Sequence, residues 1–370
     1  MTPYDVDAIR REFPVTANML YLDSAFQTPL ATSVRERLMA FYDEGHYSAG
    51  PKSVWLERLD GVRAKIAELL GAEPSEIAFT KNTSEGLSIA AHALDWNPGD
   101  NVLLLEGEHP NNTSVWLGRR KAGLEVRFVA ESRKWVDEQT FKPFVDARTR
   151  AISISHVMYH TGQRNDVARI ATFCSERGIK LVVDGMQSIG VLPVDVKSLG
   201  ISMFAAGAHK GLLTPQGIGV LYCDKVLANQ LEPEHYASEY AGGARRFELG
   251  NYNHAGVHAL DAALDLIRTA GVPAIAEHVL NLGDRLIAHL DELGIDLVGP
   301  RDRYYRSHIY VLALEAGPWL DYLAQNNVRA SRVRDGIRVS FAAFNTVQDV
   351  DRLADILGRG LASRSVRRAG

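Results

Sequence analysis

The chain has 370 residues with a formal net charge of −4, and 46% hydrophobic and 23% charged residues are ordinary for a soluble globular protein. The length exceeds what one hydrophobic core usually organises, which predicts two domains, and the small negative charge gives no electrostatic basis for binding nucleic acid or an anionic membrane. Two cysteines exclude a disulfide framework, no Cys/His group has zinc spacing, and no apolar run reaches the roughly 18 residues of a membrane helix.

The amino-terminal segment MTPYDVDAIRREF carries charged side chains where a signal peptide needs an apolar stretch. We therefore expect a cytoplasmic protein with no metal ion, no nucleic-acid partner and no membrane contact.

Short apolar runs alternate with helical patterns from about residue 54 to residue 225. The predicted strands are residues 76–80, 101–105, 125–129, 151–155, 180–184, 203–206 and 218–223, and amphipathic helices are predicted at 54–71 and 167–178. This alternation predicts an α/β fold with a mostly parallel seven-stranded sheet that is covered on both faces. The last strand follows its predecessor too closely for a full crossover, so we expect it to run antiparallel.

The pattern changes near residue 255. Long helices are predicted at 255–271 and 273–294, followed by strands at 308–314 and 336–340 and a last helix at 347–358. We expect a large domain over residues 1–255 and a smaller α+β domain over residues 256–370. The first 20 or so residues are expected to pack on the small domain.

Lys210 and Asp184 each lie at the end of a buried apolar run. A lysine forms a Schiff base only while its amine is unprotonated, which needs a desolvated setting or a nearby cation. An aspartate at the carboxyl end of a buried strand can hold a protonated pyridine ring, the electron sink of pyridoxal phosphate. Taken alone, the two residues also fit a solvated loop lysine and an N-capping aspartate.

Two further strand ends carry side chains suited to an anion or a flat ring. Asn-Thr-Ser follows the strand at 76–80 and precedes a helical run, so helix N–H groups and the hydroxyls of Thr83 and Ser84 form a natural phosphate cradle. The same residues also fit an ordinary helix cap. His109 follows the next predicted strand, where an imidazole could stack on a ring or form surface hydrogen bonds.

Seven segments resemble, in the same order, those of the class V aminotransferase group of fold-type I pyridoxal-phosphate enzymes. This group includes cysteine desulfurases, selenocysteine lyases, isopenicillin N epimerases and ergothioneine-type C–S lyases. The matching segments are YLDSAFQTPL, FTKNTSEG, EHPNNTSVW, VDGMQSIGVLPVDV, GAHKGLLTPQGIGVLY, RFELGNYNHAG and GIRVSFAAFNT. The resemblance covers nearly the whole chain and implies a pyridoxal-phosphate enzyme that forms a homodimer with active sites at the subunit interface.

The resemblance also implies roles for individual residues. Lys210 is the Schiff-base lysine and the proton carrier at the substrate Cα, Asp184 pairs with the pyridinium nitrogen, and His109 stacks on the ring. The remaining cofactor contacts are those of Gln187 with the phenolic oxygen, of Thr83, Ser84 and His209 with the phosphate, and of Asn251 with the phosphate of the neighbouring subunit. Arg338 matches the arginine that clamps the substrate carboxylate, so an α-amino acid substrate is expected.

Several positions depart from the family pattern. A desulfurase carries a nucleophilic cysteine shortly before the carboxylate arginine, but VRASRVRDGIRVS contains none. Cys174 lies in a predicted helix and Cys223 in a predicted strand, so neither is placed to accept sulfur. The other departures are Gly207, where desulfurases often have serine, Tyr159 and His160, where many relatives have asparagine, and Ala25, Phe26 and Gln27, which replace a small Ala-Ala pair in the substrate pocket.

These features favour a C–S lyase, which removes the Cα proton through Lys210 and eliminates a thiol or thiolate from Cβ of a cysteine-type substrate. The histidine at position 109 is typical of the eliminating members. An epimerase, with His160 or Tyr159 as a second acid or base, and a true aminotransferase remain alternatives, and a cofactor-binding protein without activity is a fourth. A cysteine desulfurase is disfavoured. The sequence does not specify the substrate side chain.

Overall fold

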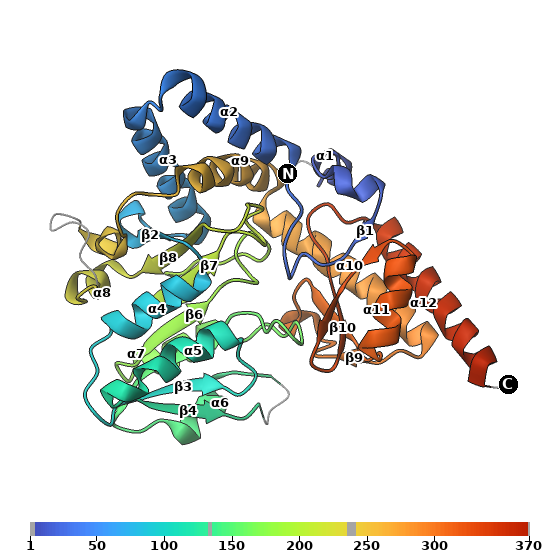
Figure 1. Ribbon diagram of the computed structural model, residues 1–370. Coiled ribbons are helices and arrows are strands. Elements are labelled where there is room, and N and C mark those ends of the chain that lie inside the picture. The colour runs from blue at the N-terminus through green and yellow to red at the C-terminus, as the bar shows by residue number, and fades with distance from the viewer. Residues whose placement is uncertain (1–3, 132–134, 235–241, 369–370) are drawn as a thin grey trace.

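The computed structural model describes residues 4–131, 135–234 and 242–368, and a seven-stranded sheet forms its centre (Figure 1). The strands are β2 (Ile77–Thr80), β3 (Asn101–Leu105), β4 (Glu125–Val129), β5 (Thr149–Ser155), β6 (Lys180–Asp184), β7 (Met203–Gly207) and β8 (Gly219–Cys223). Their spatial order is β2-β8-β7-β6-β5-β3-β4, and only β8 runs antiparallel to its neighbours. The predicted α/β fold, all seven strands and the reversal of the last one are confirmed.

Helices cover both faces of this sheet because successive strand residues point to opposite sides. The helices of this part are α2 (Thr32–Ser48), α3 (Lys52–Leu70), α4 (Thr83–Ala93), α5 (Pro110–Gly118), α6 (Glu138–Phe141), α7 (Val167–Ser175), α8 (Lys225–Gln230) and α9 (His254–Ala270). Leu103 and Leu105 of β3 belong to one apolar cluster, with residues of α3, α7 and α9, whereas Val102 and Leu104 belong to another, with residues of α4 and α5.

The carboxyl-terminal part is built around a four-stranded antiparallel sheet with the order β12-β13-β10-β9. Its elements are α10 (Val272–Leu293), β9 (Leu297–Val298), β10 (Ile309–Leu312), α11 (Ala316–Gln325), β11 (Val328–Arg329), β12 (Ser331–Val333), β13 (Gly336–Ser340) and α12 (Val347–Arg368). Helices α10, α11 and α12 gather around this sheet, and α12 ends at the far side of the molecule (Figure 1). The predicted long helices and the two predicted strands are therefore present.

The amino-terminal segment lies against this carboxyl-terminal part. It contains α1 (Val6–Arg11) and β1 (Leu20–Tyr21), and β1 pairs in parallel with β11. Arg10 forms an ion pair with Asp349 at 2.7 Å, and the Tyr4 hydroxyl donates to the carbonyl oxygen of Ala343 at 2.6 Å. The domain boundary at residues 255 and 256 stays a prediction: it falls in the first turn of α9, which packs against α2 and α3.

One edge of the large sheet gathers the carboxyl ends of its forward-running strands. In the register of the ladders, Thr80 of β2 and Gly207 of β7 both pair with Gly219 at the start of β8, and Ser155 of β5 pairs with Asp184 of β6. In open α/β sheets, ligands bind beyond this edge. The loops that follow these strands contain most of the predicted site residues.

Candidate active site

A cavity of about 700 Å³ lies beyond the carboxyl edge of the large sheet. Its lining comes from the loops after β2, β3, β5, β6 and β7 and from the amino-terminal segment. The lining residues are Phe26, Lys81, Asn82, Thr83, Ser84, His109, Asn111, Ser155, Val157, Tyr159, Asp184, Met186, Gln187, His209, Lys210, Gln216 and Gly217. A cavity of this size suits a small organic molecule with a few converging polar groups.

Lys210 lies three residues past β7 and faces this cavity. Its backbone oxygen accepts hydrogen bonds from the Thr28 hydroxyl at 2.7 Å and the Leu213 amide at 3.0 Å, which fix the loop. Burial, and secondarily the Arg338 cation, lowers the pKa of the Lys210 amine to about 8, and the carboxylate of Asp184 opposes this lowering. Roughly a tenth of the amine is therefore uncharged at pH 7, and the share grows as the pH rises towards 8. Only the uncharged amine can act as a nucleophile.

Asp184 is the last residue of β6 and its buried carboxyl group faces the same cavity. One carboxylate oxygen, Oδ1, accepts a hydrogen bond from the Met186 amide at 2.9 Å. Burial raises the pKa of Asp184 to about 6, although this hydrogen bond and the nearby Lys210 amine favour the anion. A buried carboxylate with a raised pKa is stabilised by a cationic partner in the cavity.

His109 is the N-cap residue of α5, and its Nδ1 accepts a hydrogen bond from the Asn111 amide at 3.2 Å. Its ring contacts the Tyr159 ring edge-on, with centroids 4.8 Å apart. Burial, followed by the cations of Lys210 and Arg338, lowers the pKa of His109 to about 4. The imidazole is therefore neutral at physiological pH, and its position is set by the helix cap.

The amino terminus of α4 forms the end of the cavity that is suited to an anion. Asn82 is the N-cap residue and accepts from the Glu85 amide at 2.9 Å, and Thr83 and Ser84 form the first turn. The Thr83 hydroxyl accepts from the Gly207 amide at 2.8 Å and lies 3.0 Å from the Met186 sulfur. Helix N–H groups and hydroxyls at this end would suit a phosphate.

Two more predicted cofactor contacts face the cavity. Burial lowers the pKa of His209 to about 4, with Lys210 adding to the shift, so His209 is a neutral imidazole near pH 7. The Gln187 amide nitrogen donates to the carbonyl oxygen of Ala25 at 3.0 Å. Its amide oxygen is buried and, among the described residues, has no hydrogen-bond partner. This unpartnered oxygen at the cavity wall is available to a polar group bound in the cavity.

Arg338 on β13 is buried. It is not one of the described lining residues of the cavity, but it lies next to them. Its Nη1 donates to the carbonyl oxygen of Tyr159 at 3.3 Å, and its Nη2 lies 3.5 Å from Oδ1 of Asp23. Its Nε is buried and has no partner in the described part of the chain. The guanidinium therefore keeps donor capacity for a further acceptor.

The remaining predicted substrate residues differ in their access to the cavity. Phe26 is 55% exposed and lines it, Tyr159 is half-buried and also lines it, and Gln27 accepts a hydrogen bond from the lining residue Gln216 at 3.0 Å. Ala25 is fully buried and reaches the cavity only through its hydrogen bond to Gln187.

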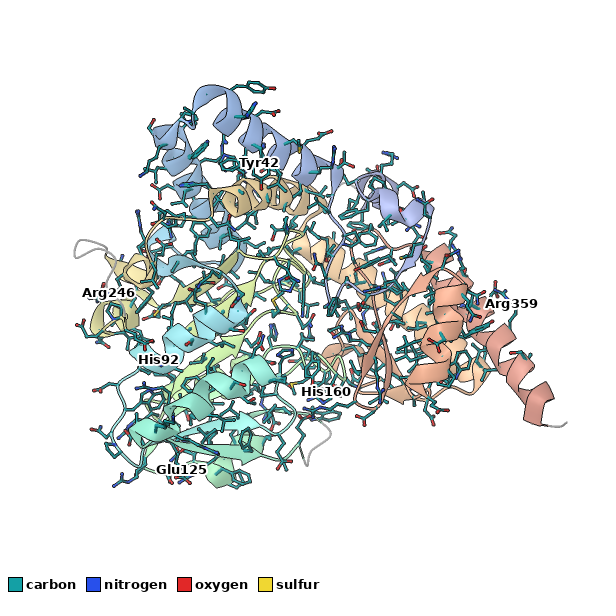
Figure 2. The ribbon with its side chains drawn as sticks, viewed as in Figure 1. Tyr42, His92, Glu125, His160, Arg246 and Arg359 are labelled. Atoms are coloured by element: carbon teal, nitrogen blue, oxygen red, sulfur yellow. The ribbon has the colours of Figure 1, made fainter. Side chains whose placement is uncertain are left out.

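His160 and Asn251 do not belong to the described lining of the cavity. His160, labelled in Figure 2, is buried in the loop after β5, and burial lowers its pKa to about 4. Asn251 is exposed, on the segment before α9. Within this one chain, neither residue is brought to the predicted ligand.

Sequence reasoning missed several lining residues, although each lies within a few positions of a predicted strand end or of Lys210. They are Lys81, Asn82, Asn111, Ser155, Val157, Met186 and Gln216, with Gly217 beside them. It also missed Glu108, a buried carboxyl group that accepts from the Ser155 hydroxyl at 2.6 Å and the Asn112 amide at 2.9 Å. Asp23, which contacts Arg338, lay in a quoted motif but received no role.

The profile of the family described as aminotransferase class-V matches residues 20–353. The chain therefore belongs to the class V aminotransferase family, and it is a pyridoxal-phosphate-dependent enzyme of fold type I. The predicted family, fold and cofactor are confirmed.

Two proteins of Schizosaccharomyces pombe are similar over most of their length. An uncharacterized protein is 36% identical over 93% of this chain and 84% of its own length, and an uncharacterized aminotransferase is 33% identical over 97% of both chains. The solved apo structure of a cysteine desulfurase from Thermococcus onnurineus has a TM-score of 0.87 at 23% identity, covering 96% of this chain and 98% of that one. The last similarity concerns the fold alone.

The cavity residues fit pyridoxal phosphate by their chemistry. The buried Asp184 carboxyl group, with its raised pKa, suits a protonated pyridine nitrogen, and the unpartnered oxygen of Gln187 suits a polar group of the cofactor. The first turn of α4 suits the phosphate, and the Lys210 amine, with its pKa near 8, suits the aldehyde. Among the described residues, no cluster of His, Cys, Asp or Glu could hold a metal ion, and no helix is long and apolar enough to cross a membrane.

Proposed function

We propose that the protein is a C–S lyase that acts on an S-substituted cysteine or a related cysteine conjugate. The observation that carries this proposal is the connection before Arg338. There β12 and β13 form a tight hairpin in which only Arg334 and Asp335 join Val333 to Gly336. A desulfurase of this family carries its persulfide-forming cysteine on a loop at this place, and this hairpin contains no cysteine.

Both cysteines are also unsuited to accept sulfur. Cys174 is buried in α7 and Cys223 is buried in β8, and neither belongs to the described lining of the cavity. Burial raises the pKa of the Cys174 thiol to about 12, and it raises the pKa of Cys223 further. Because the thiolate is the sulfur nucleophile, both groups are inert near neutral pH. The sulfur of the substrate would therefore leave as a free thiol or thiolate.

The proposed roles follow the chemistry of the side chains. Bound pyridoxal phosphate supplies an electron sink that lowers the barrier to removing the proton from Cα. The Lys210 amine, with its pKa near 8, takes that proton and can return it. The Asp184 carboxylate holds the pyridine nitrogen protonated, and the neutral His109 imidazole covers the ring. Arg338 holds the substrate carboxylate.

The overall elimination balances with no further reactant except water. The Cα–H and Cβ–S bonds break, the sulfur leaves with the electron pair of the Cβ–S bond and takes up a proton, and the remaining 2-aminoacrylate hydrolyses to pyruvate and ammonium. No oxidant, reductant or second amino acid is needed. Phe26 and Tyr159 line the cavity, so an apolar or aromatic sulfur substituent would find aromatic surface there.

Two alternatives keep specific support. Transamination is supported by the relative named an uncharacterized aminotransferase, which matches the chain over almost its whole length. Epimerisation requires a second acid or base, and Tyr159 lines the cavity whereas His160 is outside its described lining. Tyr159 therefore becomes the stronger of the two sequence candidates for that role.

The test is a product analysis with S-substituted L-cysteines such as S-benzyl-L-cysteine. We expect equimolar thiol, pyruvate and ammonium. A 2-oxo acid that retains its sulfur substituent would instead identify transamination, and inversion at Cα with solvent deuterium incorporation would identify epimerisation. Either result without thiol release would overturn the lyase proposal.

We further propose a homodimer in the cytoplasm, with Asn251 contributing to the site of the neighbouring subunit. The exposure of Asn251 and its distance in sequence from the cavity-lining segments are consistent with a role outside its own subunit. Sedimentation of the holoenzyme gives the mass of the assembly, and a monomer at working concentration would contradict shared sites.

A further inference from the structure

We propose that Asp23, together with Ser331, positions Arg338 for the substrate carboxylate and so determines selectivity for amino acids over simple amines. The inference rests on the proposed role of Arg338. Asp23, in the turn that follows β1, then has a function in substrate recognition.

The geometry begins with a cross-strand pair. Ser331 of β12 and Arg338 of β13 are directly opposite each other in the antiparallel ladder. The Ser331 hydroxyl donates to Oδ1 of Asp23 at 2.6 Å, and Nη2 of Arg338 approaches the same oxygen at 3.5 Å. Oδ1 of Asp23 therefore contacts both Ser331 and Arg338. Through this shared oxygen, the Arg338 side chain is held close to the neighbouring strand of the hairpin.

The contact between Asp23 and Arg338 is buried, which strengthens its electrostatic effect. The side chains of Asp23 and Arg338 are 1% and 6% exposed, respectively. A buried guanidinium without a counter-charge is strongly disfavoured, so Asp23 stabilises the charged clamp in the absence of substrate. At 3.5 Å the two groups form an ion pair that is longer than a normal hydrogen bond, so Asp23 does not use the full donor capacity of the guanidinium. The Nε of Arg338 also has no partner among the described residues, which leaves donor capacity for an incoming carboxylate.

The backbone holds Asp23 in place independently of its side chain. Asp23 forms an isolated parallel bridge with Ser340 at the end of β13, and the Ser340 amide donates to the carbonyl oxygen of Leu22 at 2.9 Å. The Ala25 amide donates to the Ser340 hydroxyl at 2.8 Å. The amino-terminal segment is therefore locked to the strand that carries Arg338, and it continues directly to Phe26 at the cavity.

A second arginine near the same carboxylate serves as a control. Nε of Arg329 lies 3.6 Å from Oδ2 of Asp23, but the Arg329 side chain is 55% exposed. Solvent screens such a contact, so it contributes little to orienting the carboxylate. Arg329 and Arg338 thus share an acceptor group but differ in burial.

The experiment compares binding of two probes to the holoenzyme by calorimetry and by the cofactor absorbance. The probes are L-norvaline and butylamine, which differ only by the carboxylate and have no leaving group at Cβ. Asp23→Asn keeps the shape of the side chain and removes its charge. We expect it to weaken norvaline binding by about 10-fold, the order expected for a hydrogen bond to a charged group, and to leave butylamine binding within about twofold.

Two further variants complete the comparison. Ser331→Ala retains both charges and should weaken norvaline binding by about two- to fivefold, while Arg329→Gln should change binding of either probe by less than about twofold. Far-ultraviolet circular dichroism and thermal unfolding identify a variant that fails to fold, and Ser331→Ala then decides the matter alone. An equal loss for both probes would assign Asp23 and Ser331 a purely structural role and overturn the inference.

The direction in which Asp23→Asn changes norvaline affinity also tests the proposal. Tighter norvaline binding by Asp23→Asn would mean that Asp23 competes with the substrate for Arg338, which also overturns positioning. Arg338→Lys tests the underlying assignment separately. If that variant leaves the ratio of norvaline to butylamine affinity unchanged, the proposed clamp is wrong. If it lowers the ratio while Asp23→Asn and Ser331→Ala do not, only the positioning role fails.

Discussion

Two groups of residues beside the cavity are built in different ways. The strand-end cluster, which consists of Thr83, His109, Asp184 and Lys210, comes from the end of β6 and from segments that follow other strands of the one large sheet. The arginine cluster, which consists of Asp23, Ser331 and Arg338, joins the amino-terminal segment to a hairpin more than 300 residues away in the chain. Sheet register spaces the first cluster, whereas contacts between distant segments assemble the second.

The two clusters also differ in the charge states of their residues. In the strand-end cluster, burial is the largest cause of the shifts that place the pKa of Asp184 at about 6 and that of Lys210 at about 8. In the arginine cluster, a buried cation faces a buried anion. Groups with pKa values near neutrality can exchange protons during a reaction, whereas a fixed charge pair binds. We therefore expect changes in the first cluster to affect the chemical step and changes in the second to affect substrate binding.

The largest effect is expected for Lys210→Ala, which removes the only cluster member able to attach the cofactor covalently. Turnover should fall by about 10³-fold or more, because both attachment and proton transfer are lost. Borohydride reduction of the parent holoenzyme followed by peptide mapping should label Lys210. Labelling of a different lysine would show that the strand-end cluster has been assigned incorrectly.

Asp184→Asn is the next largest change and separates chemistry from folding. The chemical step should slow by about 10²–10³-fold, the range for loss of one well-placed electrostatic group, while cofactor-free protein stays folded. Single-turnover kinetics measure the step directly. A rate within a factor of two of the parent would contradict the role of Asp184.

The same variant has a pH-dependent effect on stability. Burial raises the pKa of Asp184 to about 6 from an unfolded value of about 4, so ionisation of this group opposes folding. The cost begins as the pH rises above about 4 and is complete above about 6. Cofactor-free Asp184→Asn should therefore be more stable than the parent at pH 8, by on the order of 1–3 kcal/mol, and similar to it near pH 4. Denaturant titrations at both pH values test this sign.

In the arginine cluster, Arg338→Lys should weaken the use of amino acids by on the order of 1.5–3 kcal/mol, because lysine cannot hold a carboxylate bidentately. The loss should appear in kcat/KM, with cofactor occupancy almost unchanged. Occupancy is read from the absorbance of the cofactor. Unchanged kinetics would remove the distinction between the two clusters.

Asn251→Ala should show the opposite pattern, with looser retention of the cofactor by about 1 kcal/mol and a smaller effect on substrate use. Mixing it with Lys210→Ala protein tests site sharing. Subunit exchange should create some sites with an intact lysine and an intact partner asparagine, so tighter cofactor retention should partly return. No recovery in a mixture that has been shown to exchange subunits would contradict sharing.

The smallest effect on activity is expected for the double variant Cys174→Ser and Cys223→Ser. Both thiols are buried and lie outside the described lining of the cavity, so activity should remain within about twofold, although a buried hydroxyl can reduce stability by about 1–3 kcal/mol. Mass spectrometry of the parent during turnover is the matching control. A turnover-dependent persulfide on either cysteine would restore the desulfurase interpretation.

The sequence by itself determined the seven strands, the reversed strand and the family, because short apolar runs and short motifs are local properties of the chain. It also indicated Lys210, Asp184, His109 and Thr83, since each ends or follows a strand whose carboxyl end must lie at the binding edge of the sheet. These residues could be identified without knowing what lies opposite them.

Only the tertiary structure decided which distant residues meet. The pairing of Ser331 with Arg338 depends on the hairpin register, and their common contact with Asp23 depends on the amino-terminal segment lying beside β13. The burial of His160 and the access of Tyr159 to the cavity were equally undetermined, because the two residues are adjacent in sequence. Local patterns specify the strands and their ends, but contacts between segments hundreds of residues apart arise only when the chain packs around its core.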